Sequence, residues 1–230
     1  MKSITNQSFV LVSSKEWHIK EFHNEKKNLH GEWFVIRKKE DLNYENLQKI
    51  NPRYIFFPHW SHLVSEEITN NFECVCFHET DLPFGRGGSP IQNLINKGYE
   101  KTKITALRMT KDLDAGPIYL KKDFSLLGLA EEIYIRSAKT IIQMIKEIII
   151  NNPIPKKQTG EVLYFKRRNP QLSYIKDDLK NIDQLFDFIR MLDSDGYPKA
   201  KLETNNFIFE FSRPALRIDA IEASVRIKLK

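Results

Sequence analysis

Short apolar runs alternate with longer amphipathic stretches over the first hundred residues of the chain. Runs of four or five mainly apolar residues predict buried strands at 9–12, 33–36, 54–57 and 74–78. The segments 16–27 and 41–50 and the stretch that follows Ser65 favour helices, and the second ends before Pro52 because a residue preceding proline disfavours the α conformation. This alternation predicts βαβ units, and therefore an α/β fold with a Rossmann-like, doubly wound and mainly parallel sheet.

The pattern changes in the second half of the chain. We expect a helix at 90–97, then strands at 103–109 and 118–124 that join through a tight Gly116-Pro117 connection and add antiparallel strands to the sheet. Apolar positions spaced three and four apart predict a long amphipathic helix at 129–151, which Pro153 ends. After Pro155 come a basic aromatic segment (164–168), a helix near 182–192 and strands near 207–211 and 223–227. These features predict a main domain over 1–176 and a small α+β C-terminal subdomain over 177–230.

Composition is that of an ordinary globular protein, with 41% hydrophobic and 29% charged residues. The formal net charge is +6, but 36 basic residues are interleaved with 30 acidic ones, which favours a solvated surface over a nucleic-acid stripe. No apolar run is long enough to span a membrane, and residues 1–12 lack the pattern of a secretory signal, so we predict a cytoplasmic protein that does not bind membranes. Cys74 and Cys76 are two apart on a predicted strand, share one face and are poor disulfide partners.

The segment 76–91 contains most of the chemistry that the sequence suggests. His78 ends a predicted strand, and in an open α/β sheet that end faces the ligand crevice. Arg86 lies between glycines, which permit close backbone approach. Asp114, in the connection between two strands, can present a carboxylate to His78, where it would fix the imidazole tautomer and raise its basicity. Asp112 is an alternative partner, and a turn-capping role is an alternative for Asp114.

These residues carry a resemblance to a known family. The run His78-Glu79-Thr80-Asp81-Leu82-Pro83, with Arg86-Gly87 and Pro90-Ile91, followed by residues 113–118, resembles the signature of the folate-dependent formyltransferases over about residues 5–175. The resemblance implies N10-formyltetrahydrofolate as co-substrate and residues 1–176 as the catalytic domain. It also implies an Asn, His, Asp triad, with His78 and Asp114 as its last two members.

Cys76 departs from the family pattern, because the family has asparagine at that position. A thiol is a weak hydrogen-bond donor, and losing one oxyanion donor costs on the order of a hundredfold or more in rate. Another donor must therefore compensate. An alternative chemistry uses Cys76 as a thiol nucleophile with His78 as its base.

The resemblance also implies binding residues around this centre. The folate pocket would be lined by Phe57, Pro58, His59, Trp60, Leu82, Arg86, Gly87, Lys111, Asp112 and Leu113. The acceptor side would include Thr80, Arg167 and Arg168, although a basic surface loop is an alternative for the two arginines. His59 and His62 lack the further Cys or acidic ligands of a zinc site, so no metal is predicted.

The acceptor is the remaining question. The run 79–89 is similar to enzymes that formylate amino sugars in nonulosonic (pseudaminic-type) acid pathways, and residues 177–230 look too short for a tRNA-contacting barrel. We therefore expect a small-molecule amine, an amino sugar, as the acceptor and do not expect tRNA. Alternatives are a methionyl-tRNA or aminoacyl formyltransferase, a basic tRNA-binding protein, and a folate-binding module without catalysis. The oligomeric state is left open.

Overall fold

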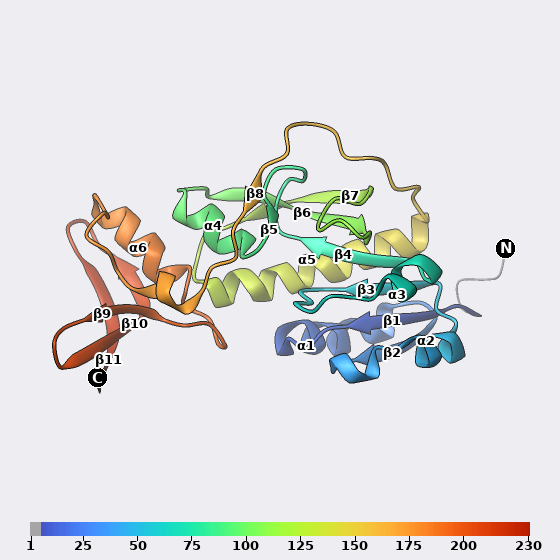
Figure 1. Cartoon of the computed structure of the whole chain (residues 1–230), viewed down its shortest axis with the longest axis horizontal. Helices are drawn as coiled ribbons and strands as arrows, with labels where there is room; N and C mark the ends of the chain where they lie inside the picture. Colours follow the sequence, from blue (N-terminus) through green and yellow to red (C-terminus); the bar gives the residue numbers. More distant parts are fainter. Residues whose placement is uncertain (1–5) are drawn as a thin grey trace. The chain divides into compact units, whose positions relative to one another are not determined.

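Six strands form one sheet whose parallel part brings three loops to a common edge. The sheet has the order β2-β1-β3-β4-β6-β7, in which β1 pairs in parallel with β2 and β3, and β3 with β4. The strands are β1 (Ser8–Val12), β2 (Glu32–Ile36), β3 (Tyr54–Phe57), β4 (Cys74–His78), β6 (Lys101–Arg108) and β7 (Ile118–Ser125). They lie side by side in Figure 1. Because parallel strands end at the same edge, the loops after β1, β3 and β4 meet there.

The computed structural model describes residues 6–230; residues 1–5, part of the segment without a signal-peptide pattern, lie outside the described range. The chain divides into two compact units. The first contains the residues up to Arg86 together with Lys103–Phe124 and Ile135–Tyr164, and the second contains Gly87–Thr102, Ser125–Tyr134 and Phe165–Lys230. The domain boundary predicted after residue 176 stays a prediction.

The helices follow the predicted segments closely. They are α1 (Glu16–Glu25), α2 (Tyr44–Ile50), α3 (Glu66–Asn71), α4 (Pro90–Asn96), α5 (Ala130–Asn151) and α6 (Ile182–Arg190), with 3-10 turns at Lys26–Asn28, Lys39–Asp41 and Pro170–Ser173. The helix expected from residue 41 begins at Tyr44, because Asn43 caps it by accepting from the Asn46 N–H at 2.9 Å. Ser65 caps α3 in the same way. The prediction of an α/β, Rossmann-like fold is confirmed.

Burial explains why the sheet holds together. Val10, Val12, Ile55 and Phe57 belong to one buried cluster with side chains from α2, α3 and β4. β6 runs antiparallel to β4, with Thr105 opposite His78, as the sequence predicted for a strand added to the parallel sheet. Among the described residues, no helix is both long and apolar enough to cross a bilayer.

The second unit contains a separate antiparallel sheet with the order β11-β10-β9. Its strands are β9 (Ala200–Glu203), β10 (Phe207–Leu216) and β11 (Ile221–Leu229). The sequence predicts parts of β10 and β11 but not β9, whose four residues alternate too briefly to give a signal. The predicted small α+β C-terminal part is confirmed.

A short two-stranded sheet pairs β5 (Arg86–Gly87) with β8 (Tyr164–Phe165), and neither strand was predicted. Gly87 has φ +104°, and a Cβ there would lie 2.4 Å from the Phe165 carbonyl oxygen. Only glycine fits such an approach without moving the backbone.

Candidate active site

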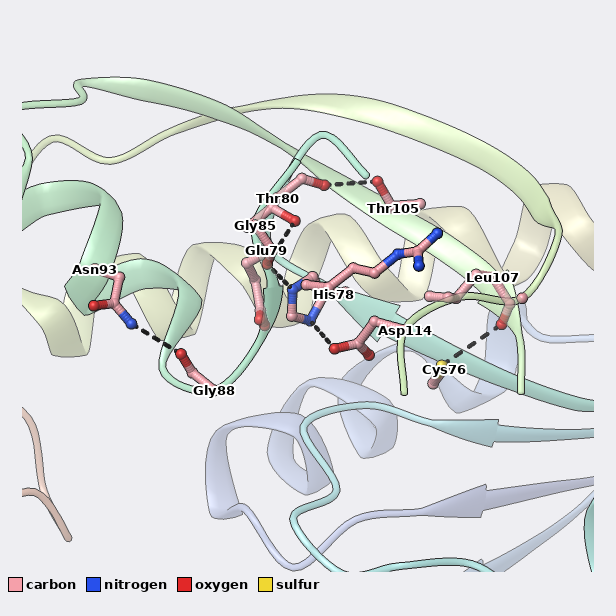
Figure 2. Close-up of polar contacts among 12 residues, drawn as sticks. Cys76, His78, Glu79, Thr80, Gly85, Gly88, Asn93, Thr105, Leu107 and Asp114 are labelled. Carbon is pink, nitrogen blue, oxygen red and sulfur yellow. Dashed lines mark hydrogen bonds and ion pairs between the residues drawn. The ribbon is translucent and has the colours of Figure 1, made fainter. Parts of the chain in front are cut away.

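His78, at the end of β4, has an acceptor close to each ring nitrogen. Its Nδ1 lies 3.6 Å from Asp114 Oδ2, and its Nε2 lies 2.7 Å from the Gly85 carbonyl oxygen (Figure 2). The two side chains are 8% and 12% exposed, so water competes little for these contacts. A neutral imidazole can donate from only one nitrogen, whereas an imidazolium donates from both. Because the Gly85 carbonyl can only accept, Nε2 of His78 carries a hydrogen.

The β6–β7 connection places Asp114 rather than Asp112 beside His78. Asp114 has φ +53°, a left-handed conformation that Asp tolerates better than most residues. At Gly116 a Cβ would lie 1.8 Å from the Arg108 carbonyl oxygen, so the turn requires glycine. Asp112 is exposed and its backbone oxygen accepts from Thr110 Oγ1 at 3.2 Å.

Gln158 holds this turn through hydrogen bonds that no sequence pattern indicated. Its Nε2 donates to the carbonyl oxygens of Asp114 and Gly116, both at 2.8 Å. Its Oε1 accepts from Arg86 Nη2 at 2.8 Å. The predicted binding residue Arg86 is thus linked to the turn that carries Asp114. Gln158 lies in a polar segment without periodicity, which explains why sequence reasoning missed it.

The loop after β4 is held by its own polar groups. Thr80 is fully buried, its Oγ1 donates to the Gly85 carbonyl at 3.4 Å, and its carbonyl accepts from Thr105 Oγ1 at 2.7 Å (Figure 2). Leu82 is also fully buried. The predicted substrate-binding role of Thr80 stays a prediction, and its hydroxyl already serves the loop.

Cys76 lies two residues before His78 on β4, and its Sγ points toward the Leu107 carbonyl oxygen at 3.7 Å (Figure 2). Burial raises the pKa of the Cys76 thiol, and the negative charge of Asp114 raises it further. The thiol therefore stays protonated. This argues against a thiolate nucleophile. Because a thiol is a weak hydrogen-bond donor, Cys76 also does not replace the amide of the family's asparagine.

A second imidazole–carboxylate pair lies at the same edge. His59 Nδ1, in the loop after β3, is 3.4 Å from Oε1 of Glu79, whose side chain is 4% exposed. Burial by itself would raise the pKa of Glu79, but the hydrogen bond from His59 and the nearby charges of His59 and His78 lower it overall. His59 has φ +53°, a strained conformation for a histidine that functional sites often retain. The pairing was not predicted; the only sequence signal was an acid placed directly after a buried strand.

Two residues of α1 pack against this pair. The rings of Trp17 and His18 lie 5.9 and 6.1 Å from the His59 ring. His18 is 1% exposed, and neither ring nitrogen has a hydrogen-bond partner among the described residues. Burial lowers the pKa of His18 well below its ordinary value, with smaller contributions from His59 and Lys15. His18 is therefore neutral.

The predicted folate-lining residues divide into a buried and an exposed group. Phe57 belongs to the core, so its backbone is the part that can face a ligand, and the Pro58 carbonyl accepts from Ser13 Oγ at 2.9 Å. Trp60 packs against the core, and its buried indole N–H has no partner among the described residues. Lys111 and Leu113 lie in the exposed part of the Asp114 turn, with Lys111 Nζ 3.3 Å from Glu66 Oε1.

The remaining predicted residues lie in the second unit. Arg168 donates its backbone N–H to Ser89 Oγ at 3.1 Å, and its guanidinium donates to the Leu172 carbonyl and lies over the Phe188 ring. Burial lowers the pKa of Arg168. Arg167 is exposed. Arg168 is thus part of the packing of this unit, whereas Arg167 is available to a ligand. In the described part of the chain, no group of three or more His, Cys, Asp or Glu side chains could hold a metal ion.

Comparison with known proteins gives a consistent family assignment. The family model described as "Formyl transferase" matches residues 7–138, and the model described as "Methionyl-tRNA formyltransferase, C-terminal domain" matches residues 170–228. The chain is 30% identical over 196 residues to the methionyl-tRNA formyltransferase of Thermotoga maritima, covering 84% of this chain and 58% of that protein. It spans about half the length of the curated relatives that it matches.

Solved structures agree with the sequence matches. A methionyl-tRNA formyltransferase from Clostridium thermocellum is 43% identical, with a TM-score of 0.94 over 97% of this chain and 100% of that one. A sugar N-formyltransferase from a Shewanella species is 16% identical, with a TM-score of 0.70 over 93% of this chain and 99% of that one. The second likeness shows a shared fold alone.

These matches contradict two expectations. The expected amino-sugar acceptor and the exclusion of tRNA are wrong, because the more similar proteins are methionyl-tRNA formyltransferases. The motif after β4 lies within residues 7–138, which match a model described only as "Formyl transferase", so it could not identify the acceptor. The argument from length failed because a segment as short as 170–228 matches the C-terminal domain of such enzymes.

The expected formyl donor is confirmed, since this family uses N10-formyltetrahydrofolate. Its flat, hydrogen-bonding ring fits a sheet edge with a buried indole N–H at Trp60 that no described residue satisfies. The match over 7–138 covers more than half of the sequence. The chain belongs to the formyl transferase family.

Proposed function

We propose that this chain transfers the formyl group of N10-formyltetrahydrofolate to the α-amino group of methionyl-tRNA. The observation that carries the proposal is the 43% identity to the Clostridium thermocellum methionyl-tRNA formyltransferase over 97% of the chain. The C-terminal match over 170–228 supports it independently of the motif after β4.

The residues that would hold the donor follow from the site. The backbone of Phe57–Trp60, the Trp60 indole and the turn Lys111–Leu113 offer hydrogen-bonding groups and an apolar edge. When bound, N10-formyltetrahydrofolate supplies the formyl carbon and a nitrogen leaving group.

The His78–Asp114 pair would stabilise the charge that develops during transfer. Asp114 Oδ2 lies 3.6 Å from Nδ1 of His78 and orients the ring. The Nε2–H of His78, once released from the Gly85 carbonyl, would donate to the developing oxyanion and take over from the amide that is absent at Cys76. Mutational data for such donors in other enzymes indicate an effect on the order of 10²–10³ in kcat.

The test uses the full chain with N10-formyltetrahydrofolate and four acceptors: methionyl-tRNA, uncharged tRNA, free methionine and a nucleotide-linked amino sugar. Tetrahydrofolate release is followed by absorbance, and the product is hydrolysed and analysed for formylmethionine by mass spectrometry. We expect turnover with methionyl-tRNA and none with uncharged tRNA or the amino sugar. Transfer to the amino sugar with none to methionyl-tRNA would disprove the proposal.

A further inference from the structure

The antiparallel sheet of the second unit, β11-β10-β9, has an apolar and a charged face (Figure 1). In β11 every odd-numbered residue is apolar and every even-numbered residue is polar or charged. Directly opposite residues of an antiparallel pair lie on the same face of a sheet. The register between β10 and β11 joins the apolar pairs Phe207–Leu229, Phe209–Ile227 and Phe211–Val225. The apolar face therefore continues from β10 to β11.

The apolar side chains of β11 are left uncovered. Val225, Ile227 and Leu229 are 47%, 60% and 79% exposed, and Phe207 on β10 is 41% exposed. Soluble proteins normally protect an edge strand with charges, proline or a covering segment, because an exposed apolar row favours association. The uncovered row on β11 thus indicates a surface that binds a partner.

The backbone of β11 is also open on the side away from β10. Among the described residues, β10 is the only strand that pairs with β11. The Lys230 N–H donates to the Asn206 carbonyl at 3.1 Å, so the backbone groups of the even-numbered residues face β10. Because hydrogen-bonded and non-hydrogen-bonded positions alternate in an antiparallel pair, the N–H and C=O groups of Val225, Ile227 and Leu229 point outward. A further strand can add there through backbone hydrogen bonds.

The opposite edge of this sheet is already covered in part. The Ile175 N–H donates to the Lys201 carbonyl of β9 at 2.7 Å, and Tyr174 forms a parallel bridge with Lys201. The open edge and the uncovered apolar row therefore coincide on β11.

The sequence of β11 is complementary to itself in the antiparallel direction. When two copies are aligned about Val225, all residues of the strand Ile221–Leu229 pair. Apolar residues then lie opposite apolar ones, and Glu222 lies opposite Lys228 of the second copy on both sides of the axis. A slip by one residue would place polar and charged side chains opposite the apolar row. This complementarity of charge and face favours a second copy of the chain over an unrelated partner.

We propose that two copies of this chain associate through antiparallel pairing of β11 with β11 about a two-fold axis at Val225. The outward backbone groups of Val225 meet those of the same residue in the second copy, and the two three-stranded sheets become one continuous sheet. Glu222 already contacts Arg217 at 2.7 Å, but both side chains are more than half exposed, and such ion pairs contribute little and can be exchanged. The pairing does not depend on the proposed formyl transfer and is tested separately from it.

Sedimentation velocity of the full chain, from about 1 to 100 µM, measures the association. We expect a wild-type dimer whose fraction rises with concentration. Val225→Lys should raise the dissociation constant on the order of 100-fold, because it places like charges opposite each other at the axis and breaks the apolar row. The matched control is Leu202→Lys, which makes the same change on the same face but on β9, the other edge strand. It should associate as wild type does.

A charge reversal tests the register. Glu222→Lys should weaken association about tenfold, because like charges then face each other on both sides of the axis. Adding Lys228→Glu to the same chain should restore association to within about threefold of wild type, since opposite charges face each other again in exchanged positions. A dimer that Val225→Lys abolishes but that neither charge reversal changes would overturn the axis at Val225.

The remaining outcomes also decide the proposal. A wild type that stays monomeric at the highest concentration would overturn it, as would a dimer that Val225→Lys leaves intact. Equal losses in Val225→Lys and Leu202→Lys would show that the apolar faces stack and the edges do not pair. A monomer whose Val225→Lys variant loses affinity for methionyl-tRNA would assign the face to RNA instead.

Thermal unfolding identifies variants that fail to fold, and hydrogen exchange of the wild type then decides. The amides of Ile221–Leu229 should exchange more slowly as the protein concentration rises, because pairing protects the outward N–H groups. Exchange that does not change with concentration would contradict the pairing.

Discussion

Three side chains near the carboxyl edge of the sheet take different charge states because their surroundings differ. His18 has no polar partner for its ring nitrogens and is neutral. Glu79 is as deeply buried but contacts His59, and its carboxylate is ionised. Burial and, to a smaller extent, the nearby Asp114 raise the pKa of the Cys76 thiol, which stays protonated. The residue types alone do not assign these charge states, because each state depends on surroundings that residues distant along the chain provide.

The state of Cys76 gives a first prediction. Because the thiol is protonated and directed at the Leu107 carbonyl, Cys76→Ala should keep formyl-transfer kcat within about threefold of wild type. Steady-state kinetics with methionyl-tRNA measures this, with Cys74→Ala, a buried thiol on the same strand, as the matched control. A loss above a hundredfold would restore the thiol-nucleophile alternative.

A second prediction concerns Asp114. Asp114→Asn keeps the side-chain shape and suits φ +53°, but it removes the charge beside His78. We expect kcat to fall 10²- to 10⁴-fold with little change in donor affinity or thermal stability. Asp112→Asn, in the exposed part of the same turn that we assign to donor binding, is the comparison: it should change the KM for the donor and leave kcat within about threefold of wild type. Equal losses in the two variants would show that the turn, rather than the Asp114 charge, matters.

At the scale of elements, connections as well as strands position the candidate catalytic side chains. β4 and β6 fix His78 opposite Thr105, but Asp114 reaches His78 only through the turn after β6. That turn depends on Gly116 for its close approach to Arg108 and on Gln158 for two hydrogen bonds. The strands were predictable from local apolar runs. The hydrogen bonds from Gln158 to the turn join residues more than forty positions apart and have no local sequence signature.

A third prediction follows from this connection. Gln158→Ala leaves two carbonyl oxygens and the Arg86 guanidinium without this partner, so the Asp114 turn should loosen. We expect kcat to fall about tenfold and the free energy of unfolding to fall by about 1–3 kcal/mol. Urea unfolding and kinetics measure the two effects, and Gln48→Ala on the exposed face of α2 should change neither. Unchanged kcat in Gln158→Ala would mean that the turn is held by its other contacts.

At the scale of the whole molecule, burial links stability to pH. The pKa of His18 is lowered in the folded state by desolvation, whereas the unfolded chain titrates near 6.5. Below that value the unfolded chain binds a proton that the folded protein does not, so the unfolded state gains stability. The contribution of His18 is therefore present above about pH 6.5 and is lost as pH falls.

The fourth prediction is the size of that loss. Between pH 6.5 and 5, above the range of most carboxylates, the free energy of unfolding should fall by up to about 1.4 kcal/mol per pH unit. His18→Leu should remove most of this slope, while His23→Gln, an exposed histidine of α1, should leave it intact. Denaturant unfolding at several pH values measures it, and a slope that persists in His18→Leu would assign it to other groups.

The fifth prediction concerns the proposed RNA partner. Lys166 and Arg167 are exposed on the second unit, and the double variant to alanine should weaken tRNA binding and reduce the slope of log K against log salt by one to two. The exposed pair Lys38 and Lys39 belongs to the other basic cluster and is the matched control. Binding measured by filter retention over a salt series decides between them. An effect confined to the control pair would place the RNA elsewhere.

The sequence by itself determined the strands β1, β3 and β4, the long helix α5 and the α/β class. The spacing of apolar residues that predicts these elements is a property of residues close together in the chain. It also indicated His78 and Asp114, through a strand end and a turn whose local chemistry is distinctive. Only the tertiary structure decided which carboxylate meets His78, that Glu79 pairs with His59, and that Gln158 secures the turn. Those contacts join residues 20 to 44 positions apart, and their energies depend on burial and geometry that exist only once the chain has folded.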